Sequence, residues 1–297
     1  MPNQSDKRKI LVIGRGFLGE SIYRVGIGIG YEVVGTHHSR CTDGPLLDIS
    51  DINQVEFVIK KINPDHIINS AALGNVDFLE THQDLAMQVN YIGASNVAKI
   101  SNENDIGIIH ISTDSVFDGL KGGYSEDDKP NPINAYSRSK HLGELEVSKN
   151  SKNHIVIRTN FYGINKRGDY FFNWILNNLK SNNTITGFTD IIFSPLDVTT
   201  LGRMIIELLD VKYRGILHLS SGKPISKFDF IIDVARKLKM SSDNIKRGSQ
   251  SNNPTLAPRP KNTWLKNDVA KKLLKTPILD LSSWIDRNRS EINRYLK

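Results

Sequence analysis

Three glycines near the start of the chain constrain the fold more than any other feature. Gly14, Gly16 and Gly19 have the spacing G-x-G-x-x-G and lie between the apolar run KILVI and an amphipathic stretch typical of a helix. In this context the first glycine permits a tight turn, the second lets a pyrophosphate approach the backbone, and the third lets the helix pack on its strand. Phosphate would then meet the helix N-terminus. The sequence therefore predicts a dinucleotide-binding turn.

Strand and helix patterns alternate after this turn. Residues 31–36, 66–73 and 108–113 are short apolar runs that predict strands, whereas residues 52–62 and 81–105 have the apolar spacing of helices. Such alternation favours an α/β fold with a doubly wound parallel sheet.

The residues after the second strand bear on the choice of cofactor. That strand ends at Thr36, about where an NAD-preferring site carries an acidic residue for the adenosine ribose. Arg40 follows instead, and its guanidinium can pair with a 2′-phosphate. We therefore expect NADPH, although either NADP or NAD would serve if Arg40 lies in solvent.

Two further pairs of residues lie at the ends of predicted strands. Asp48 and Ile49 end a short strand at a place suited to an adenine edge. Ala71 and Ala72 end an apolar strand, where they would let a cofactor lie against the backbone.

A phenol and an ammonium lie four residues apart in NAYSRSKHLGELEV, a run with helical spacing. Tyr136 and Lys140 therefore project from one face of a helix, and a cation within about 4 to 6 Å lowers the pKa of a tyrosine. Thr113 ends a buried strand upstream, at the sheet edge where ligands of open α/β folds bind. Together they predict a site that can protonate a carbonyl oxygen as it is reduced. A lone Y-x-x-x-K is common, so the neighbouring motifs carry this prediction.

Composition excludes several classes of function. The net charge of +7 comes from basic residues scattered along 297 positions, which indicates a solvated surface rather than a nucleic-acid site. The single cysteine, Cys41, excludes an internal disulfide and a multi-cysteine zinc site, and the eight histidines form no ligand-spaced cluster, so we expect no metal. No run reaches the roughly 18 apolar residues of a membrane span. We expect a cytoplasmic protein, and the sequence leaves a homodimer open.

Several sequence blocks, taken in order, resemble a known family. They are NSAALGNVDFLE, HISTDSVFDG, GGYSEDDKPNPINAYSRSKHLGE and IRTNFYG, and with the glycine turn they extend from residue 10 to about residue 163. On these blocks the chain resembles an extended short-chain dehydrogenase/reductase, and it is most similar to the dTDP-4-dehydrorhamnose reductases and their sugar-nucleotide relatives.

The resemblance assigns roles to individual residues. It implies that the catalytic residues are Thr113, Tyr136 and Lys140. It implies that the cofactor is bound by Gly14, Gly16, Phe17, Leu18, Gly19, Arg40, Asp48, Ile49, Ala71, Ala72, Tyr136 and Lys140. It implies that the substrate is bound by Asn75, Val76, Asp77, Ser115, Asn160 and Arg259.

The resemblance also implies a reaction and a domain arrangement. NADPH would reduce the C4 ketone of a nucleotide-linked 4-keto-6-deoxy sugar, taken as dTDP-4-dehydro-L-rhamnose, while Tyr136 protonates the alkoxide. We expect residues 1–165 to form an NADP-binding Rossmann domain to which the chain returns at 195–222 and 278–297. Residues 166–194 and 223–277 would form a smaller, discontinuous substrate-binding domain. We expect the aromatic run from Phe171 to Ile175, with Phe172 and Trp174, to be core rather than a platform for the sugar.

The chain departs from the family pattern at three places. Ile13 occupies the position of the first glycine, Ser115 replaces a tyrosine, and Phe193 to Leu196 replace a G-x-P-T segment. The last two changes lie on the expected sugar side and keep a reductase or epimerase of another nucleotide sugar as an alternative. A second alternative is a non-catalytic, NADP-binding regulatory subunit similar to the methionine adenosyltransferase β subunit.

Overall fold

The computed structural model of the protein describes residues 8–39, 43–165, 168, 170–252 and 257–297. Its larger part is a six-stranded parallel sheet in the order β10-β5-β4-β3-β1-β2. The strands are β1 (Lys9–Ile13), β2 (Glu32–Gly35), β3 (His66–Asn69), β4 (Gly107–Ile111), β5 (His154–Thr159) and β10 (Gly215–Leu219). The predicted doubly wound α/β fold is confirmed.

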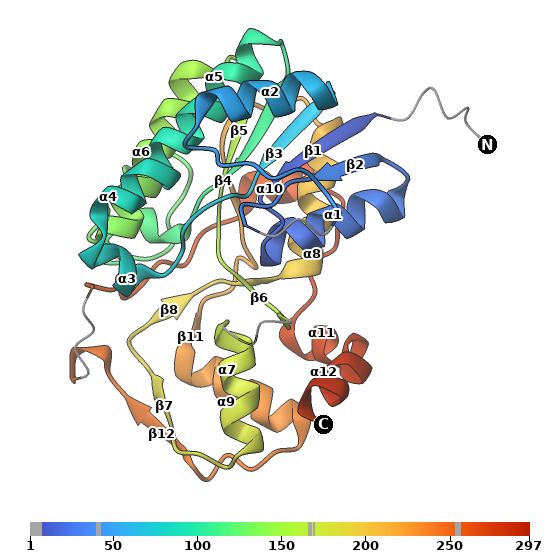
Figure 1. Ribbon diagram of the computed structural model, residues 1–297. Helices are drawn as coiled ribbons and strands as arrows, with labels where there is room; N and C mark the ends of the chain where they lie inside the picture. Colours follow the sequence, from blue (N-terminus) through green and yellow to red (C-terminus); the bar gives the residue numbers. More distant parts are fainter. Residues whose placement is uncertain (1–7, 40–42, 166–167, 169, 253–256) are drawn as a thin grey trace.

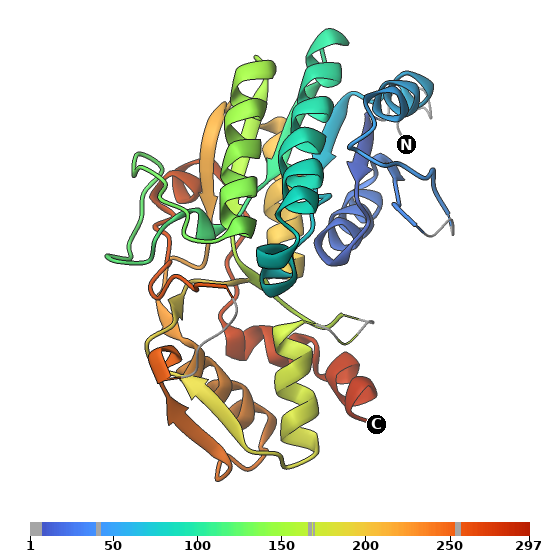
Figure 2. The same cartoon turned by 60° about the vertical axis from the view of Figure 1, so that its left-hand side comes forward.

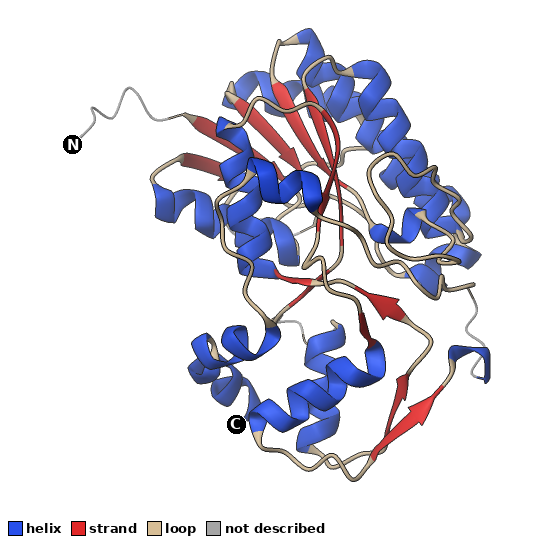
Figure 3. Ribbon diagram, turned by 180° about the vertical axis from the view of Figure 1, so that it is seen from behind, coloured by secondary structure: helices blue, strands red, loops and turns tan. Residues whose placement is uncertain are grey.

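Helices cover both faces of this sheet because successive strand residues point to opposite sides. On one face lie α2 (Ile52–Ile62), α5 (Ala94–Glu103) and α6 (Ala135–Asn150), which stand in front of the sheet in Figure 2. On the other face lie α1 (Phe17–Ile29), α8 (Val198–Glu207) and α10 (Asp268–Leu273), seen from behind in Figure 3. In β1, for example, Ile10 and Val12 join one core and Leu11 and Ile13 the other.

The order of the strands fixes where a ligand can bind. The chain runs outward from β1 to β2, then crosses back to β3 on the other side of β1. Open α/β sheets bind ligands at such a reversal, outside the carboxyl ends of the strands. The glycine turn, the residues after β3 and the residues after β4 all meet at this edge.

The expected helix over residues 81–105 is divided into separate segments. It begins with α3 (Val76–Thr81) and α4 (Gln83–Ala86), continues as a π-helical stretch, η2 (Met87–Gly93), and ends as α5. The π-helical stretch turns Asn90 inward, where its amide accepts from the backbone N–H of Leu73 and donates to the Leu73 carbonyl and to Ser139 Oγ. Asn90 thereby holds the segment after β3 against α6.

The smaller part of the molecule lies below the carboxyl edge of the sheet in Figure 1. Its elements are α7 (Phe171–Lys180), β7 (Ile185–Phe188), β8 (Ile192–Phe193), β11 (Ile225–Ser226), α9 (Lys227–Leu238), β12 (Ile245–Gly248), α11 (Leu281–Arg287) and α12 (Arg289–Leu296). Strand β7 pairs with β12, and β8 pairs with β11. Its core is rich in aromatic side chains, with Tyr162, Phe172, Phe230 and Trp284 in mutual ring contact.

Several short elements connect the two parts. Strands β6 (Phe161–Tyr162) and β9 (Leu196–Asp197) pair in parallel where the chain passes between them. Three short 3₁₀ turns, η3 (Asp114–Val116), η4 (Leu208–Asp210) and η5 (Gln250–Asn252), complete the described elements.

Two segments differ from the domain boundaries expected from sequence. The last helices, α11 and α12, pack with α9 and α7 in the smaller part, because Trp284, Ile285 and Ile292 belong to its aromatic core. Conversely, α10 packs on β10 of the main sheet through Ala270 and the adjoining Leu274. Residues 278–297 therefore do not return to the first domain as expected.

Candidate active site

The glycine turn is shaped by close backbone contacts. Gly14 has φ +84°, and a Cβ there would lie 2.6 Å from Ala71 Cα. A Cβ on Gly19 would lie 2.1 Å from the Gly14 carbonyl oxygen, so the helix could not pack on its turn. Gly16 differs, because a Cβ there would meet nothing within 4 Å. It is also the N-cap of α1, and no side chain caps the backbone N–H groups there. The turn thus presents an open, N–H-rich surface that fits a phosphate.

The other expected cofactor residues at this edge lie in different surroundings. Leu18 is core, whereas Phe17 is half-buried and its ring lies 4.7 Å from that of Tyr170. Ala71 lies under the turn and, like Ala72, follows β3. The Asp48 carboxylate accepts from the backbone N–H and hydroxyl of Ser50.

Ile49 is buried in the core against Gly93. Its backbone carbonyl accepts from Asn96. The side chain of Ile49 thus packs in the interior.

An arginine of the glycine turn, Arg15, lies against the end of β2 and was not predicted from the sequence. Arg40 lies outside the described residues. Arg15, from the glycine turn, donates its backbone N–H to the Thr36 carbonyl and lays its guanidinium 3.7 Å from the centre of the Tyr23 ring. It pairs with Glu20 and Asp43. The position of Arg15 between Gly14 and Gly16 was the sequence feature that could have indicated a cation beside the cofactor site.

Thr113 and Tyr136 meet at the carboxyl end of β4. Thr113 caps the turn η3, where its hydroxyl accepts from the Ser115 N–H. Asn134 caps α6 two residues before Tyr136. Burial raises the pKa of Tyr136 to about 12, a hydrogen bond with the Thr113 hydroxyl lowers it, and the nearby Asp114 raises it. The phenol is therefore fully protonated at neutral pH.

Lys140 makes a different contact from the one expected. Its ammonium donates to the Ile111 carbonyl at 2.6 Å, and Nζ lies 3.4 Å from His110 Nε2. Burial lowers the pKa of Lys140 to about 8, against an opposing effect of Glu144. Lys140 is not among the groups that shift the pKa of Tyr136, and its ammonium is directed to the end of β4.

A buried ion pair supports this catalytic segment from beneath. Glu144, one turn after Lys140 on α6, accepts from Arg158 on β5 at 2.7 Å and from the Ser112 hydroxyl at 2.5 Å. Both charged side chains are about 2% exposed or less. Burial raises the pKa of Glu144, but the hydrogen bonds from His141, Arg158 and Ser112 prevail and lower it to about 2. The pair therefore fixes α6 on the sheet next to Thr113.

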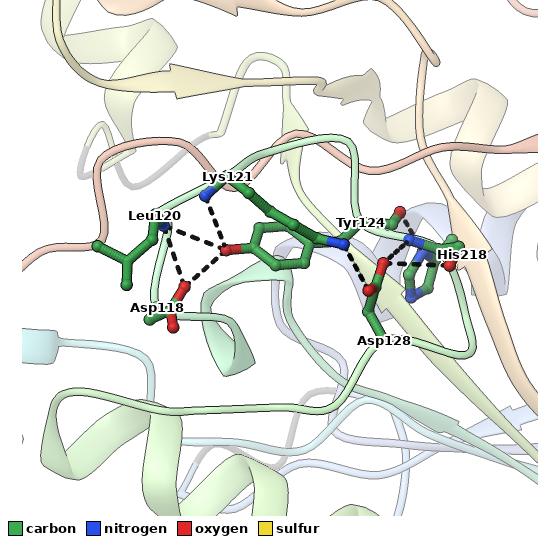
Figure 4. A network of polar contacts seen from close by, with 7 residues as sticks. Asp118, Leu120, Lys121, Tyr124, Asp128 and His218 are labelled. Atoms are coloured by element: carbon green, nitrogen blue, oxygen red, sulfur yellow. Dashed lines mark hydrogen bonds and ion pairs between the residues drawn. The ribbon is translucent and has the colours of Figure 1, made fainter.

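The long loop between η3 and α6 is held by the polar network in Figure 4. The Tyr124 hydroxyl donates to Asp118 and accepts from the backbone N–H of Leu120, while its ring stacks on Phe117 at 4.1 Å. Asp128 accepts from the backbone and hydroxyl of Ser125. These contacts give the loop one shape and so position the start of α6, which carries Tyr136.

A pocket of about 350 Å³ opens between the sheet edge and the smaller part, beside Asp114 and Ser115, the two residues that follow Thr113. Thr113, Tyr136 and Lys140 are not among its lining residues. Three expected substrate residues line it, namely Ser115, Asn160 and Arg259. Its other walls are formed by Asp114, Phe171, Trp174, Thr186, Phe188, Ile191, Phe193, Lys227, Ile231, Gln250, Pro260 and Thr263. Asn75, Val76 and Asp77 are not among the lining residues of this pocket.

The pocket corrects the expectation for the aromatic run of α7. Phe172 and Ile175 are buried in the core as expected. Phe171 and Trp174 instead line the pocket, and Trp174 is 42% exposed. A helix presents neighbouring residues on different faces, so part of an aromatic run can pack while the rest faces a ligand.

Residues of α3 approach the pocket through Arg259. Asp77 accepts from Arg259 Nη2 at 2.8 Å and from the Ala257 N–H at 3.0 Å. Asn75 caps α3, and Val76 begins it. The structure thus joins Asp77 and Arg259, which were expected separately, into one ion pair.

Two absences hold for the described part of the chain. No helix there is long and apolar enough to cross a membrane. No group of three or more histidine, cysteine, aspartate or glutamate side chains there could hold a metal ion.

Comparisons with known proteins agree with the sequence blocks. The family model described as RmlD substrate binding domain matches residues 8–295. The chain is 34% identical over 226 residues to the probable low-salt glycan biosynthesis reductase Agl14 of Haloferax volcanii, covering 72% of this chain and 75% of that protein. It is 29% identical over 269 residues to methionine adenosyltransferase 2 subunit beta of Bos taurus, covering 87% and 80%.

A solved structure matches nearly the whole chain. It is the dTDP-4-dehydrorhamnose reductase of Bacillus anthracis str. Ames in complex with NADP. The TM-score is 0.82 at 30% identity, and the match covers 97% of this chain and 98% of that one. These matches confirm the family resemblance inferred from the sequence.

Proposed function

This chain belongs to the family of the RmlD substrate binding domain, and we propose that it is an NADPH-dependent reductase of a nucleotide-linked 4-keto-6-deoxy sugar. The substrate we propose is dTDP-4-dehydro-L-rhamnose, and the product is dTDP-L-rhamnose. One observation carries the proposal. A dTDP-4-dehydrorhamnose reductase whose structure was solved with NADP is 30% identical to this chain, and the match covers 97% of this chain.

The glycine turn and the end of β3 fit a dinucleotide. Gly16 leaves open space at the uncapped start of α1, and the small residue Ala71 lies against Gly14 in the same turn. Tyr136 and Lys140 would hold the nicotinamide end. Arg15, at the end of β2, is a further cation for a 2′-phosphate, which would compete with Asp43 for its guanidinium. When bound, the dinucleotide supplies the hydride for carbonyl reduction.

Three side chains of this chain would act on the ketone. Tyr136, protonated because burial raises its pKa to about 12, donates its proton to the alkoxide oxygen. Thr113 donates a hydrogen bond to the same oxygen as negative charge develops. Lys140 holds the carboxyl end of β4 through the Ile111 carbonyl and supplies a positive charge near the site.

The sugar would lie in the pocket lined by Ser115, Asn160 and Arg259. Ser115 replaces the larger tyrosine of the family pattern, so it leaves more room beside the ketone. Asn75, Val76 and Asp77 would approach the sugar from α3.

The test measures loss of nicotinamide absorbance with NADPH and a panel of 4-keto sugar nucleotides. We expect the fastest turnover with the dTDP-linked 4-keto-6-deoxy sugar. Tyr136→Phe should abolish turnover and leave NADPH affinity nearly unchanged, because it deletes only the proton donor. Tyr213→Phe, which alters a tyrosine before the amino end of β10, is the matched control and should remain active. No turnover with any sugar on the panel would contradict the proposal.

A regulatory role is the second candidate, because the chain is 29% identical to a methionine adenosyltransferase subunit over 87% of its length. Copurification with a methionine adenosyltransferase catalytic subunit, together with NADPH binding and no ketone turnover, would favour this role. We further propose a cytoplasmic location and a homodimer. Cell fractionation and light scattering test them.

A further inference from the structure

Lys227 occupies an unusual position in the pocket. It is the first residue of α9, and its ammonium lies over two aromatic rings, 3.9 Å from the centre of Phe171 and 3.6 Å from that of Phe193. Among the described residues, Lys227 Nζ has no hydrogen-bond partner. The three N–H bonds of this ammonium are therefore left to a ligand.

The one carboxylate in the pocket wall is already occupied. Asp114 is buried and accepts hydrogen bonds from Thr263 Oγ1 at 2.7 Å and from Asn160 Nδ2 at 3.2 Å, in addition to the Thr113 hydroxyl. It acts on Lys227 through its charge, without a direct hydrogen bond among those observed. The walls from α7 and β8 are aromatic. On the same helix, Asp229 is bonded to Ser226.

A second cation in the same pocket also has a free donor. Arg259 uses Nη2 to bind Asp77, whereas its Nη1 is buried without a partner in the described structure. Two cationic side chains thus line one cavity, and each has a donor without a hydrogen-bond partner among the described residues.

The position of Lys227 is unfavourable for the fold alone. The first turn of a helix carries a partial positive charge and stabilises anions rather than cations. Burial also lowers the pKa of Lys227 to about 7, although Asp114 opposes this shift. A negatively charged ligand would relieve both effects, since it pairs with the ammonium and with the helix N-terminus.

We propose that Lys227 binds the diphosphate of the nucleotide sugar and thereby determines that this pocket takes a diphosphate-linked substrate. The inference rests on the proposed function, because the diphosphate is the anionic group of such a substrate. It adds a specificity-determining residue to Arg259.

The inference predicts that substrate binding takes up a proton. Above about pH 7 the free amine is neutral, so the ligand must bind together with a proton and affinity falls as pH rises. The charged groups of the pocket wall are Asp114, Arg259 and Lys227 itself. Burial raises the pKa of Asp114, and we assign the pH dependence to Lys227 because its pKa lies at about 7.

The experiment measures the Kd of dTDP-glucose and of UDP-glucose by calorimetry at about pH 6 and about pH 9, with NADPH present. Neither ligand carries a ketone, so binding is separated from turnover. For the tighter of the two, the wild type should bind about tenfold or more weakly at the higher pH. Lys227→Met should weaken binding about tenfold or more at the lower pH and remove the pH dependence. Lys227→Arg should bind tightly at both pH values.

Two controls make the result specific. Lys223→Met removes an exposed lysine four residues earlier, before β11, and should leave every Kd unchanged. NADPH affinity should be the same in all variants, which shows that the fold is intact. A Lys227→Met variant with wild-type affinity and pH dependence would overturn the inference, as would failure of the wild type to bind either sugar nucleotide.

The outcome is separable from that of the proposed function. Binding of a sugar nucleotide that depends on Lys227, without reduction of any ketone in the panel, would support the inference and refute the reductase. Ketone reduction with a KM that is unaffected by Lys227→Met would do the reverse.

Discussion

The buried pair of Glu144 and Arg158 allows a stability change to be worked out from the structure. Glu144→Gln keeps the shape of the side chain but removes the charge that faces the guanidinium at 2.7 Å. Breaking a buried pair by removing one partner costs about 3–5 kcal/mol, because the other charge stays buried without compensation. The pKa of Glu144 gives a similar figure: a fall from 4.5 to about 2 corresponds to about 3 kcal/mol.

The sign of the pH dependence follows from the lowered pKa. Stability from Glu144 is fully present above about pH 4.5 and is lost as pH falls toward about 2, where the folded protein also binds the proton. We therefore expect Glu144→Gln to lose about 3–5 kcal/mol at pH 7 and to approach the wild type in acid.

Urea unfolding followed by tryptophan fluorescence measures this loss. The matched control is Glu56→Gln on α2, because Glu56 pairs with Lys60 and both side chains are more than 40% exposed, so the change should cost about 1 kcal/mol or less. Replacing both Glu144 and Arg158 by Met should recover most of the stability. A loss below about 1 kcal/mol for Glu144→Gln at pH 7 would refute the reasoning.

Three further predictions concern the site. Because burial lowers the pKa of Lys140 to about 8, kcat/KM should fall as pH rises through about 8, and a profile flat to about pH 9.5 would count against this role. Gly14→Ala should lower the free energy of unfolding by about 2–4 kcal/mol, because the φ of Gly14 is +84° and Ala71 leaves no room for a Cβ. Gly16→Ala should change the free energy of unfolding by less than about 1 kcal/mol and should weaken NADPH binding. Equal unfolding midpoints for the two variants would contradict the prediction for Gly14. Thr113→Val should reduce kcat by about 10²-fold or more with little change in NADPH affinity, and an unchanged kcat in the ketone assay would remove Thr113 from catalysis.

Local sequence patterns predicted the scaffold because they report short-range geometry. The G-x-G-x-x-G spacing placed the turn between β1 and α1, and the apolar runs located strands of the parallel sheet. Tyr136 and Lys140 were placed on one helix by their spacing alone. These features depend on residues close in sequence, so the sequence suffices to find them.

Contacts between distant residues were beyond the reach of such patterns. The acceptor of the Lys140 ammonium, the Ile111 carbonyl, lies 29 positions away, and the spacing of Tyr136 and Lys140 could not reveal it. The sequence around Lys227 shows only a lysine that follows the capping residue Ser226. The fold brings the rings of Phe171 and Phe193 close to its ammonium. The final helices have one apolar side, which predicts burial but not which core they join.

Two neighbouring strands of the main sheet, β5 and β10, lie far apart in the sequence, and this separation has a consequence for synthesis of the chain. Strand β5 ends at Thr159, and its outer neighbour β10 begins at Gly215, so residues 160–214 leave the ribosome while one edge of β5 has no partner. An unpaired edge strand is a template for wrong pairing. We expect ribosome-bound chains stalled before β10 to need chaperones and chains released after α12 to be protease-resistant. Pulse proteolysis of the ribosome-bound and the released chains would measure the difference.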